Sequence, residues 1–473
     1  MNDTTIAAIS TAYGESGIGI VRMSGPESLN VLKKVFRRFS EGYGKDTALP
    51  CSEEFEFKPR HMYYGNIEDT DSGQKIDECL AVYMPGPHSY TGEDVAEIQC
   101  HGSVISYKKI LSLLLKNGAV PAEPGEFTKR AFLNGRMDLA QAEAVIDIIK
   151  ARSSRSFDTA VDQLSGSLSQ RVRAIRALLL DLLVDLSVNM DYPDEDIEEV
   201  TYEKLSDSIK TVKDKLSELA ASSGEGRIIR EGLLVSIVGK PNVGKSSLMN
   251  MILRDNRSIV TDIPGTTRDT IEEQISIRGI SMRFVDTAGI HESSDIIENI
   301  GIERSKDAFN KADLILFILD PSQEVSEEDR QLLEMTEGRQ SILIINKNDI
   351  IEDSRSALEA AGISHERLES AVYISAKTGE GLKELEDKIE NVVTGGKVHR
   401  TEDVLITNVR HADLINKAIN ELNEALAMTE ASEAMDFIEV NVRVAFDALG
   451  EITGETASGE IINEVFSRFC LGK

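Results

Sequence analysis

The stretch LLVSIVGKPNVGKSS, residues 233–247, decides how the central part of this chain folds. Its apolar first half, 233–238, is typical of a buried strand. The segment from Gly239 to Ser246 then fits the pattern G-x-x-x-x-G-K-[ST], and a helical pattern follows it. In such a loop backbone N–H groups surround phosphate oxygens, Lys245 reaches the β- and γ-phosphates, and the Ser246 hydroxyl binds Mg²⁺. A structural glycine loop is the alternative, but the order strand, loop, helix predicts a nucleotide site.

Two later segments indicate which base is bound. Asn346-Lys347-Asn348-Asp349 follows the apolar run 341–345, and a carboxylate there can accept both the N1 and N2 hydrogens of guanine. Adenine offers no such pair of donors, so the segment favours GTP over ATP. Ser375-Ala376-Lys377 follows the next apolar run and resembles the loop that supports the guanine O6 in GTPases.

Between these segments lie residues suited to sensing the γ-phosphate. Asp286 begins Asp-Thr-Ala-Gly, and we expect it to hold Mg²⁺ through water while the Gly289 N–H bonds the γ-phosphate. Upstream, Gly-Thr-Thr-Arg-Asp at 265–269 supplies Thr267 to the Mg²⁺ shell. Hydrolysis also needs an aligned water. Ile290 occupies the place of the water-orienting Gln in Ras-like enzymes, so another group must orient the water.

The pattern of apolar runs predicts a multidomain protein of α/β and α parts. Short runs in 1–120 predict an α/β domain, and a 3.6-residue period predicts a helical domain in 121–230 that ends in a linker at 222–232. Apolar strands alternating with helices in 231–396 predict a Ras-like G domain with a doubly wound parallel sheet. Residues 397–473 are helical again, so we expect the G domain to be inserted in the helical domain.

Composition limits the possible functions. The chain has 473 residues, with 81 Asp and Glu against 52 Lys and Arg, giving a formal net charge of −29. Such a surface is unsuited to non-specific binding of nucleic acid. The four cysteines, Cys51, Cys79, Cys100 and Cys470, lack zinc-site spacing and fit a reducing cytoplasm. Neither a signal peptide nor a membrane-spanning run is expected.

The blocks outside the nucleotide motifs resemble one family, the MnmE (TrmE) tRNA-modifying GTPases, over nearly the whole chain. They include GIVRMSG at 19–25, YTGEDVAEIQCHG at 90–102, GEFTKRAFLNGRMDLAQAEAV at 125–145 and the terminal FCLGK at 469–473. The resemblance implies a K⁺-dependent GTPase that acts with the flavoprotein MnmG. Together they would add a carboxymethylaminomethyl or aminomethyl group at C5 of the wobble uridine of certain tRNAs. A ribosome-assembly GTPase of the Era or double-G-domain class is the alternative.

The resemblance also implies roles for residues of the G domain. It places K⁺ beside the β–γ bridge, bound by the Asn242 side chain and by backbone oxygens of Thr261, Ile263 and Thr266. It assigns activation of the water to Glu298. With the motifs above, the residues expected to contact GTP are Asn242, Val243, Gly244, Lys245, Ser246, Ser247, Thr261, Asp262, Ile263, Pro264, Gly265, Thr266, Thr267, Asp286, Thr287, Ala288, Gly289, Asn346, Lys347, Asp349, Ser375, Ala376 and Lys377.

For the N-terminal domain the resemblance implies binding of 5-formyl- or methylene-tetrahydrofolate. The matching positions are Arg22, Glu97, Arg136 and Lys473, although the family commonly has Lys where Arg136 stands. Cys470 lies near the chain end and is a candidate for a redox or catalytic role, or for a buried apolar one. The family further implies a homodimer formed by this domain, a heterotetramer with MnmG, and tRNA as substrate.

Overall fold

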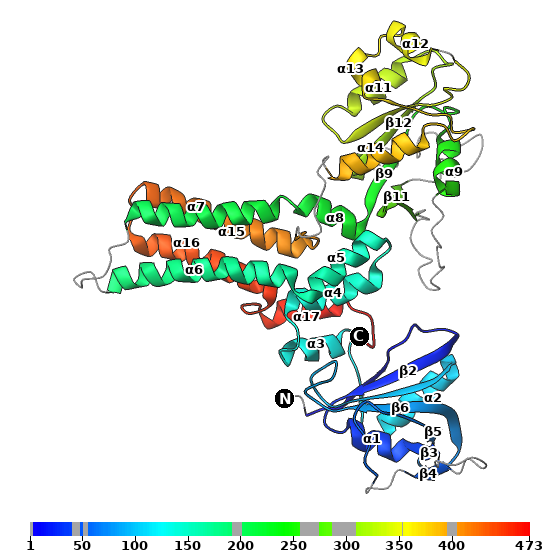
Figure 1. Cartoon of the computed structure of the whole chain (residues 1–473), viewed down its shortest axis with the longest axis vertical. Coiled ribbons are helices and arrows are strands. Elements are labelled where there is room, and N and C mark those ends of the chain that lie inside the picture. The colour runs from blue at the N-terminus through cyan, green and yellow to red at the C-terminus, as the bar shows by residue number, and fades with distance from the viewer. Residues whose placement is uncertain are drawn as a thin grey trace. The chain divides into compact units, whose positions relative to one another are not determined.

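The computed structural model describes residues 3–39, 48–50, 55–191, 201–255, 274–285, 309–351, 353–394 and 404–473. The chain divides into two compact units (Figure 1). Unit 1 comprises Met1–Ile146, Gln163–Ala177 and Phe446–Lys473, and unit 2 comprises Asp147–Asp162 and Leu178–Ala445. In the described part of the chain, every helix is too short or too polar to cross a bilayer.

Unit 1 contains an eight-stranded sheet. Its strands are β1 (Ile6–Ile9), β2 (Ser16–Ser24), β3 (Phe36–Phe39), β4 (Ala48–Pro50), β5 (Met62–Glu68), β6 (Lys75–Met84), β7 (Val95–Gly102) and β8 (Val120–Pro121). The strand order is β4-β3-β5-β6-β7-β2-β1-β8, and all neighbours are antiparallel except β1 and β8. The expected α/β character of this region is therefore confirmed.

Two helices, α1 (Ser28–Val35) and α2 (Val104–Lys116), pack together on one face of this sheet. Their apolar residues join those of the strands in one core, in which Leu32 and Ile110 are fully buried. Helix α2 begins directly after Ser103, whose side chain accepts a hydrogen bond from the Ile105 N–H. Strands β3, β4 and β8 have only two to four residues each, which is too short to show a clear alternation of apolar and polar residues.

Unit 2 contains a six-stranded sheet. Its strands are β9 (Leu233–Val238), β10 (Gln274–Ile277), β11 (Ile280–Val285), β12 (Leu314–Leu319), β13 (Ser341–Ile345) and β14 (Val372–Tyr373). The order is β10-β11-β9-β12-β13-β14, and only β10 is antiparallel to its neighbour. All six residues of β12 are buried, as expected of a central strand covered on both faces. The predicted parallel sheet is thus confirmed, with β10 as an addition.

Helices account for most of the remaining described residues. Around the six-stranded sheet they are α9 (Lys245–Asp255), α11 (Glu327–Met335), α12 (Ser354–Ala360), α13 (His365–Glu369) and α14 (Leu382–Thr394). Elsewhere they are α3 (Glu126–Leu133), α4 (Leu139–Lys150), α5 (Ser154–Ser165), α6 (Ser167–Asp191), α7 (Tyr202–Ala220), α8 (Ser223–Glu231), α15 (Val409–Glu430), α16 (Met435–Thr453) and α17 (Gly459–Ser467). Helices α7 and α15 lie side by side through buried apolar stripes (Figure 1).

The segment 222–232 was predicted to be a linker, and that prediction is wrong, because it forms α8. The helix is held by ion pairs, from Arg227 to Asp313 at 2.6 Å and from Arg230 to Asp147 at 2.9 Å. Gly226 is buried so closely that a Cβ atom there would lie 2.2 Å from the Ile406 carbonyl oxygen. The small residues that suggested a flexible linker instead permit close packing of a helix.

This packing predicts opposite effects for two glycines of α8. In a helix, Ala is normally more favourable than Gly by about 1 kcal/mol. Gly224→Ala should therefore raise the midpoint of thermal unfolding slightly, because no atom lies within 4 Å of its Cβ position. Gly226→Ala should lower it, since overpacking typically costs about 1–3 kcal/mol. Equal shifts in the two variants would show that α8 does not pack as described.

Candidate functional site

The loop after β9 has a backbone that only glycine permits at two positions. Gly239 has φ +152°, and a Cβ atom there would lie 2.6 Å from the Ile318 carbonyl oxygen. Gly244 has φ +104°, and its Cβ would lie 2.1 Å from Asn346 Nδ2. Asn242 adopts a left-handed φ of +66°, a conformation that Asn tolerates better than most residues. The loop then enters α9 at Lys245.

Lys245 is held by the loop itself. Its Nζ donates to the carbonyl oxygens of Gly239 at 2.5 Å and Lys240 at 3.1 Å. Burial lowers the pKa of Lys245, because desolvation disfavours the charged ammonium. A phosphate bound by the loop would favour the charged form, so the position suits an anionic ligand.

Asn346 joins the loops that follow three different strands. Its side chain is 2% exposed. Its Nδ2 donates to the Val243 carbonyl oxygen at 2.8 Å, and its Oδ1 accepts from the Ala376 N–H at 3.0 Å. The structure therefore brings the glycine-rich loop and the segments 346–349 and 375–377 together.

Lys347 makes a second connection between these loops. It has φ +61°, and its Nζ donates to the Asn242 carbonyl oxygen at 3.1 Å and to Asp320 Oδ2 at 2.5 Å. Burial acts to raise the pKa of Asp320, but hydrogen bonds from Lys347 and Ser322 outweigh it and lower the pKa overall. The role of Asp320 was not predicted, because only the fold brings the end of β12 next to residue 347.

The residues expected to recognise guanine lie beside this framework. Asp349 and Lys377 are exposed, so a base can approach both. Ser375 is buried, and its Oγ accepts a hydrogen bond from the Thr378 N–H at 3.3 Å, which shapes the loop around Ala376. An exposed carboxylate is thus available at one edge of the sheet, as recognition of the N1 and N2 hydrogens of guanine requires.

The oxygen donors for cations are only partly described. Asn242, Ser246 and Ser247 are exposed at the loop and at the start of α9. Amide and hydroxyl oxygens are donors that hard cations such as Mg²⁺ prefer. The remaining predicted residues lie outside the described part of the chain: Thr261, Asp262, Ile263, Pro264, Gly265, Thr266, Thr267, Asp286, Thr287, Ala288, Gly289 and Glu298.

A second cluster of predicted residues lies in unit 1. Arg22 on β2 and Glu97 on β7 face each other in the sheet register, and their side chains form an ion pair of 2.7 Å. The guanidinium groups of Arg22 and Arg136 lie 5.3 and 5.1 Å from the centre of the Tyr90 ring. Arg136 also donates to the Tyr90 carbonyl oxygen at 2.7 Å. Arg22 and Arg136 therefore meet at Tyr90, which was not predicted, and Glu97 is joined to them through Arg22.

The end of the chain is held beside β1. The Gly472 carbonyl oxygen accepts a hydrogen bond from Ser10 Oγ at 3.0 Å, and the Cys470 carbonyl oxygen accepts one from the Gly125 N–H at 3.4 Å. Lys473 is half-buried and the Cys470 side chain is exposed. The exposure of Cys470 does not fit the alternative of a buried apolar cysteine.

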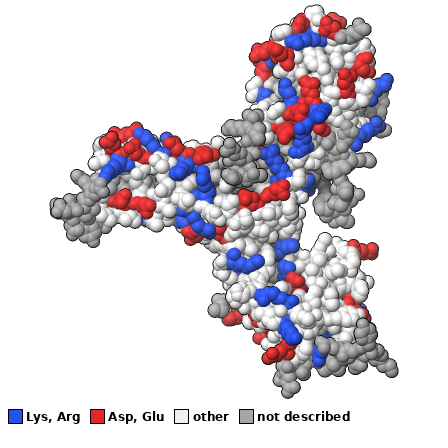
Figure 2. All heavy atoms as spheres, viewed as in Figure 1, with Lys and Arg blue, Asp and Glu red and all other residues white. Residues whose placement is uncertain are grey.

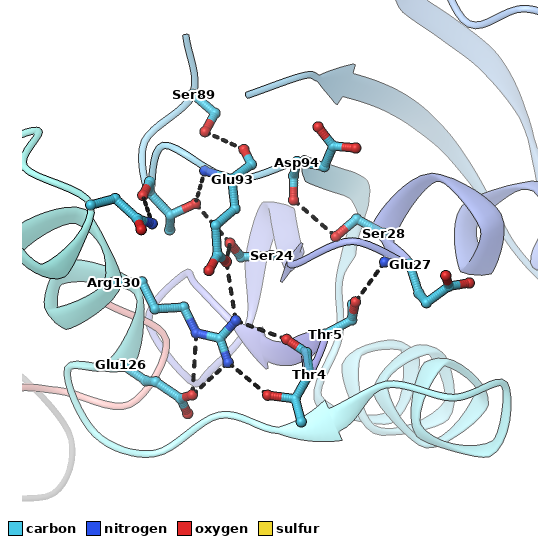
Figure 3. A network of polar contacts seen from close by, with 12 residues as sticks. Thr4, Thr5, Ser24, Glu27, Ser28, Ser89, Glu93, Asp94, Glu126 and Arg130 are labelled. Carbon is cyan, nitrogen blue, oxygen red and sulfur yellow. Dashed lines mark hydrogen bonds and ion pairs between the residues drawn. The ribbon is translucent and has the colours of Figure 1, made fainter. Parts of the chain in front are cut away.

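The loop that carries Tyr90 is fixed by a buried arginine (Figure 3). Arg130 on α3 has a side chain only 2% exposed, and it forms ion pairs with Glu93 at 3.0 Å and Glu126 at 2.8 Å. It also donates to the Thr4 carbonyl oxygen at 2.8 Å, and Ser24 Oγ donates to Glu93 at 2.8 Å. These contacts connect α3, the start of the chain and the loop before β7.

The sheet of unit 2, its glycine-rich loop and the two base-side loops define a P-loop protein of the GTPase class. Residues 139–470 match the family model described as the MnmE helical domain, and residues 5–136 match that of the GTP-binding protein TrmE N-terminus.

Curated relatives give the same picture. The tRNA modification GTPase MnmE of Alkaliphilus metalliredigens is 46% identical, covering 100% of this chain and 99% of that protein. The protein of the same name from Clostridioides difficile is 47% identical, with the same shares covered. The G-domain of FeoB from Methanococcus jannaschii is 25% identical, covering 34% of this chain and 98% of that one, with a TM-score of 0.23. The chain belongs to the MnmE family of tRNA modification GTPases.

This membership confirms the resemblance inferred from the sequence and the expected fold class. It does not favour the ribosome-assembly class that the sequence left as the alternative.

Proposed function

We propose that this chain hydrolyses GTP with the help of K⁺ and, with the flavoprotein MnmG, modifies tRNA. The modification is a carboxymethylaminomethyl or aminomethyl group at C5 of the wobble uridine. The observation that carries this proposal is the match to tRNA modification GTPases over the full chain, together with three nucleotide loops joined through Asn346.

In this proposal each loop has one task. Asp349 reads guanine, and the glycine-rich loop with Lys245 binds the phosphates. Mg²⁺ is held by Ser246 and Thr267 and supplies charge neutralisation at the phosphates. Glu298 orients the attacking water, since Ile290 cannot accept a hydrogen bond from it.

K⁺ is proposed to bind the Asn242 side chain and backbone oxygens of Thr261, Ile263 and Thr266. The described geometry of Asn242 supports its part in this set. Its carbonyl oxygen already accepts a hydrogen bond from Lys347, and its side chain is exposed at the loop. The amide oxygen therefore remains available for a cation beside the phosphates.

The cluster at Tyr90 is proposed to bind 5-formyl- or methylene-tetrahydrofolate as a one-carbon substrate. The Glu97 carboxylate suits the amino and amide groups of the pterin, and the cations Arg136 and Lys473 suit the carboxylates of the glutamate tail. The ion pair with Arg22 holds Glu97 in place before a ligand arrives. Exposed Cys470 lies on the same terminal segment and is a candidate for a redox role.

The proposal includes a homodimer formed by the N-terminal sheet, and a heterotetramer with MnmG. Tyr64 and Leu80 are cross-strand neighbours on β5 and β6 and are 49% and 36% exposed, which suits an apolar interface. Because the chain has a formal net charge of −29, we assign the basic surface for tRNA to MnmG. On the face shown in Figure 2, Lys and Arg are interspersed with Asp and Glu.

The proposal also includes a cytoplasmic location. It further includes four functional domains, which are residues 1–120, 121–230, 231–396 and 397–473. The described cysteines Cys79, Cys100 and Cys470 are free thiols, as a reducing compartment allows.

The K⁺ assignment predicts a specific loss in Asn242→Ala. Without the amide ligand, stimulation of GTP turnover by K⁺ over Na⁺ should disappear while guanine nucleotide still binds. Turnover is measured in the two salts at equal ionic strength. Asn250→Ala, on the exposed surface of α9, is the matched control and should keep the stimulation. A mutant that retains the full K⁺ effect would remove Asn242 from the cation site.

The folate assignment predicts that Arg22→Ala weakens binding of 5-formyl-tetrahydrofolate about 10- to 100-fold, the range expected for losing charge-assisted hydrogen bonds. Calorimetric titration of the full chain measures it. Arg38→Ala is the control, because Arg38 also lies over an aromatic ring, that of Phe55, but on β3, four strands away from β2. Unchanged affinity in Arg22→Ala would contradict the assignment.

The tRNA assignment is tested by nucleoside analysis of tRNA from a strain that lacks the gene for this chain. The modified wobble uridines should be absent, and the wild-type gene should restore them. Because GTP hydrolysis is proposed to be required, Glu298→Ala should fail to restore them. An unaltered nucleoside profile in the deletion strain would refute the proposed role in tRNA modification.

A further inference from the structure

The connection between β12 and α11 carries two buried carboxylates that face the nucleotide loops. Asp320 lies directly after β12 and is 5% exposed, and Asp329 lies in the first turn of α11 and is 4% exposed. Each forms an ion pair with a lysine of a nucleotide loop, Asp320 with Lys347 and Asp329 with Lys240. One segment, 320–329, therefore holds both the base-side loop and the phosphate loop.

The first ion pair is fixed on its acidic side. Asp320 Oδ1 accepts hydrogen bonds from the Ser322 N–H at 2.9 Å and from Ser322 Oγ at 2.6 Å. Its Oδ2 accepts from Gln323 Nε2 at 2.9 Å and from Lys347 at 2.5 Å. Lys347 also fixes the phosphate loop, because its Nζ donates to the Asn242 carbonyl oxygen.

The second ion pair is fixed through one carboxylate oxygen of Asp329. Asp329 Oδ2 accepts from the Ser326 N–H at 3.0 Å as part of the capping box of α11. The same oxygen pairs with Lys240 Nζ, which also donates to the Glu324 carbonyl oxygen at 3.3 Å. The Lys240 carbonyl oxygen in turn accepts from Lys245. Asp329 thus holds Lys240 in place, and the backbone of Lys240 orients Lys245, the lysine that faces the phosphates.

We propose that the segment 320–329 is a brace for the nucleotide loops, and that Asp320, Asp329 and Lys240 are positioning residues that slow the release of guanine nucleotide. The proposal rests on the proposed binding of GTP by the same loops. Removing one partner of a buried ion pair leaves the other charge uncompensated, so the loop that carried the lysine shifts or loosens. A ligand must then order the loop as it binds, which lowers its affinity. Such a loss of affinity appears mainly as a faster dissociation rate.

The test uses the full chain loaded with N-methylanthraniloyl-GDP and chased with excess GDP, with fluorescence reporting release. Asp320→Asn and Lys240→Met should each release the nucleotide about tenfold faster, the usual scale for a charged hydrogen bond. Turnover at saturating GTP should fall no more than about twofold, because Lys245 keeps its second anchor, the Gly239 carbonyl oxygen, when Lys240 loosens. The effect therefore appears in KM and in release rather than in kcat.

Three variants separate positioning from general destabilisation. Ser326→Ala removes the cap hydroxyl of α11, which also donates to Asp329 Oδ2 at 3.2 Å, but it keeps the ion pair of Asp329 and Lys240, so release should change less than twofold. Asp353→Asn alters a carboxylate that caps α12 and should have no effect on release. Lys240→Arg keeps the charge opposite Asp329 and should restore most of the wild-type rate.

A double-mutant cycle tests the second pair directly. Asp329→Asn should speed release as Lys240→Met does, and the double variant should be no faster than either one, since both remove the same contact. If Lys240→Met does not fold, Asp329→Asn carries the same prediction.

Two failures are distinguishable. If the wild-type chain does not load the fluorescent GDP, the proposed nucleotide site is wrong. If it loads, but Asp320→Asn, Lys240→Met and Asp329→Asn release at the wild-type rate, the nucleotide site stands and the brace is refuted. Lowered thermal stability without faster release would likewise refute it.

Discussion

One buried amide holds the nucleotide site of this chain together. The Asn346 side chain donates a hydrogen bond to the glycine-rich loop and accepts one from the loop after β14. Neither loop can therefore move without breaking a hydrogen bond inside the protein. A buried polar group left without its partner is costly, so the amide specifies a single arrangement of the loops. The contact of Gly244 with this amide explains why that position needs glycine, since any Cβ would collide with Nδ2.

Unit 1 uses the same device with a charge in place of an amide. Arg130 is buried, and Glu93, Glu126 and Thr4 accept its hydrogen bonds (Figure 3). A buried guanidinium is tolerated only when such partners surround it. These contacts fix the loop that carries Tyr90, and with it the guanidinium groups of Arg22 and Arg136 beside the Tyr90 ring. In both units a loop with few apolar side chains is therefore ordered by buried polar contacts.

The sequence predicted what depends on local pattern and missed what depends on distant contacts. Strands β9, β12 and β13 are continuous apolar runs, and the loop after β9 has a motif whose spacing follows from phosphate binding, so both could be predicted. Asp320, Arg130 and Tyr90 could not, because their partners lie far away along the chain. Helix α8 was missed for a related reason. Its glycines look flexible in sequence, and only the approach of Ile406 shows that Gly226 is there for packing.

The ion pairs also determine how much positive charge remains for the phosphates. Lys240 and Lys347 each face a buried carboxylate, so their charges are largely balanced within the protein. Lys245 instead faces two carbonyl oxygens, which orient the ammonium without neutralising it. Of these three lysines, only Lys245 thus offers a full charge to a triphosphate, which carries several negative charges. Transfer of a phosphoryl group requires neutralisation of the charge that develops at the β–γ bridge, and a single ammonium group supplies only part of it. In a chain that commits Lys240 and Lys347 to holding its loops, the proposed K⁺ site would supply part of that neutralisation beside Mg²⁺.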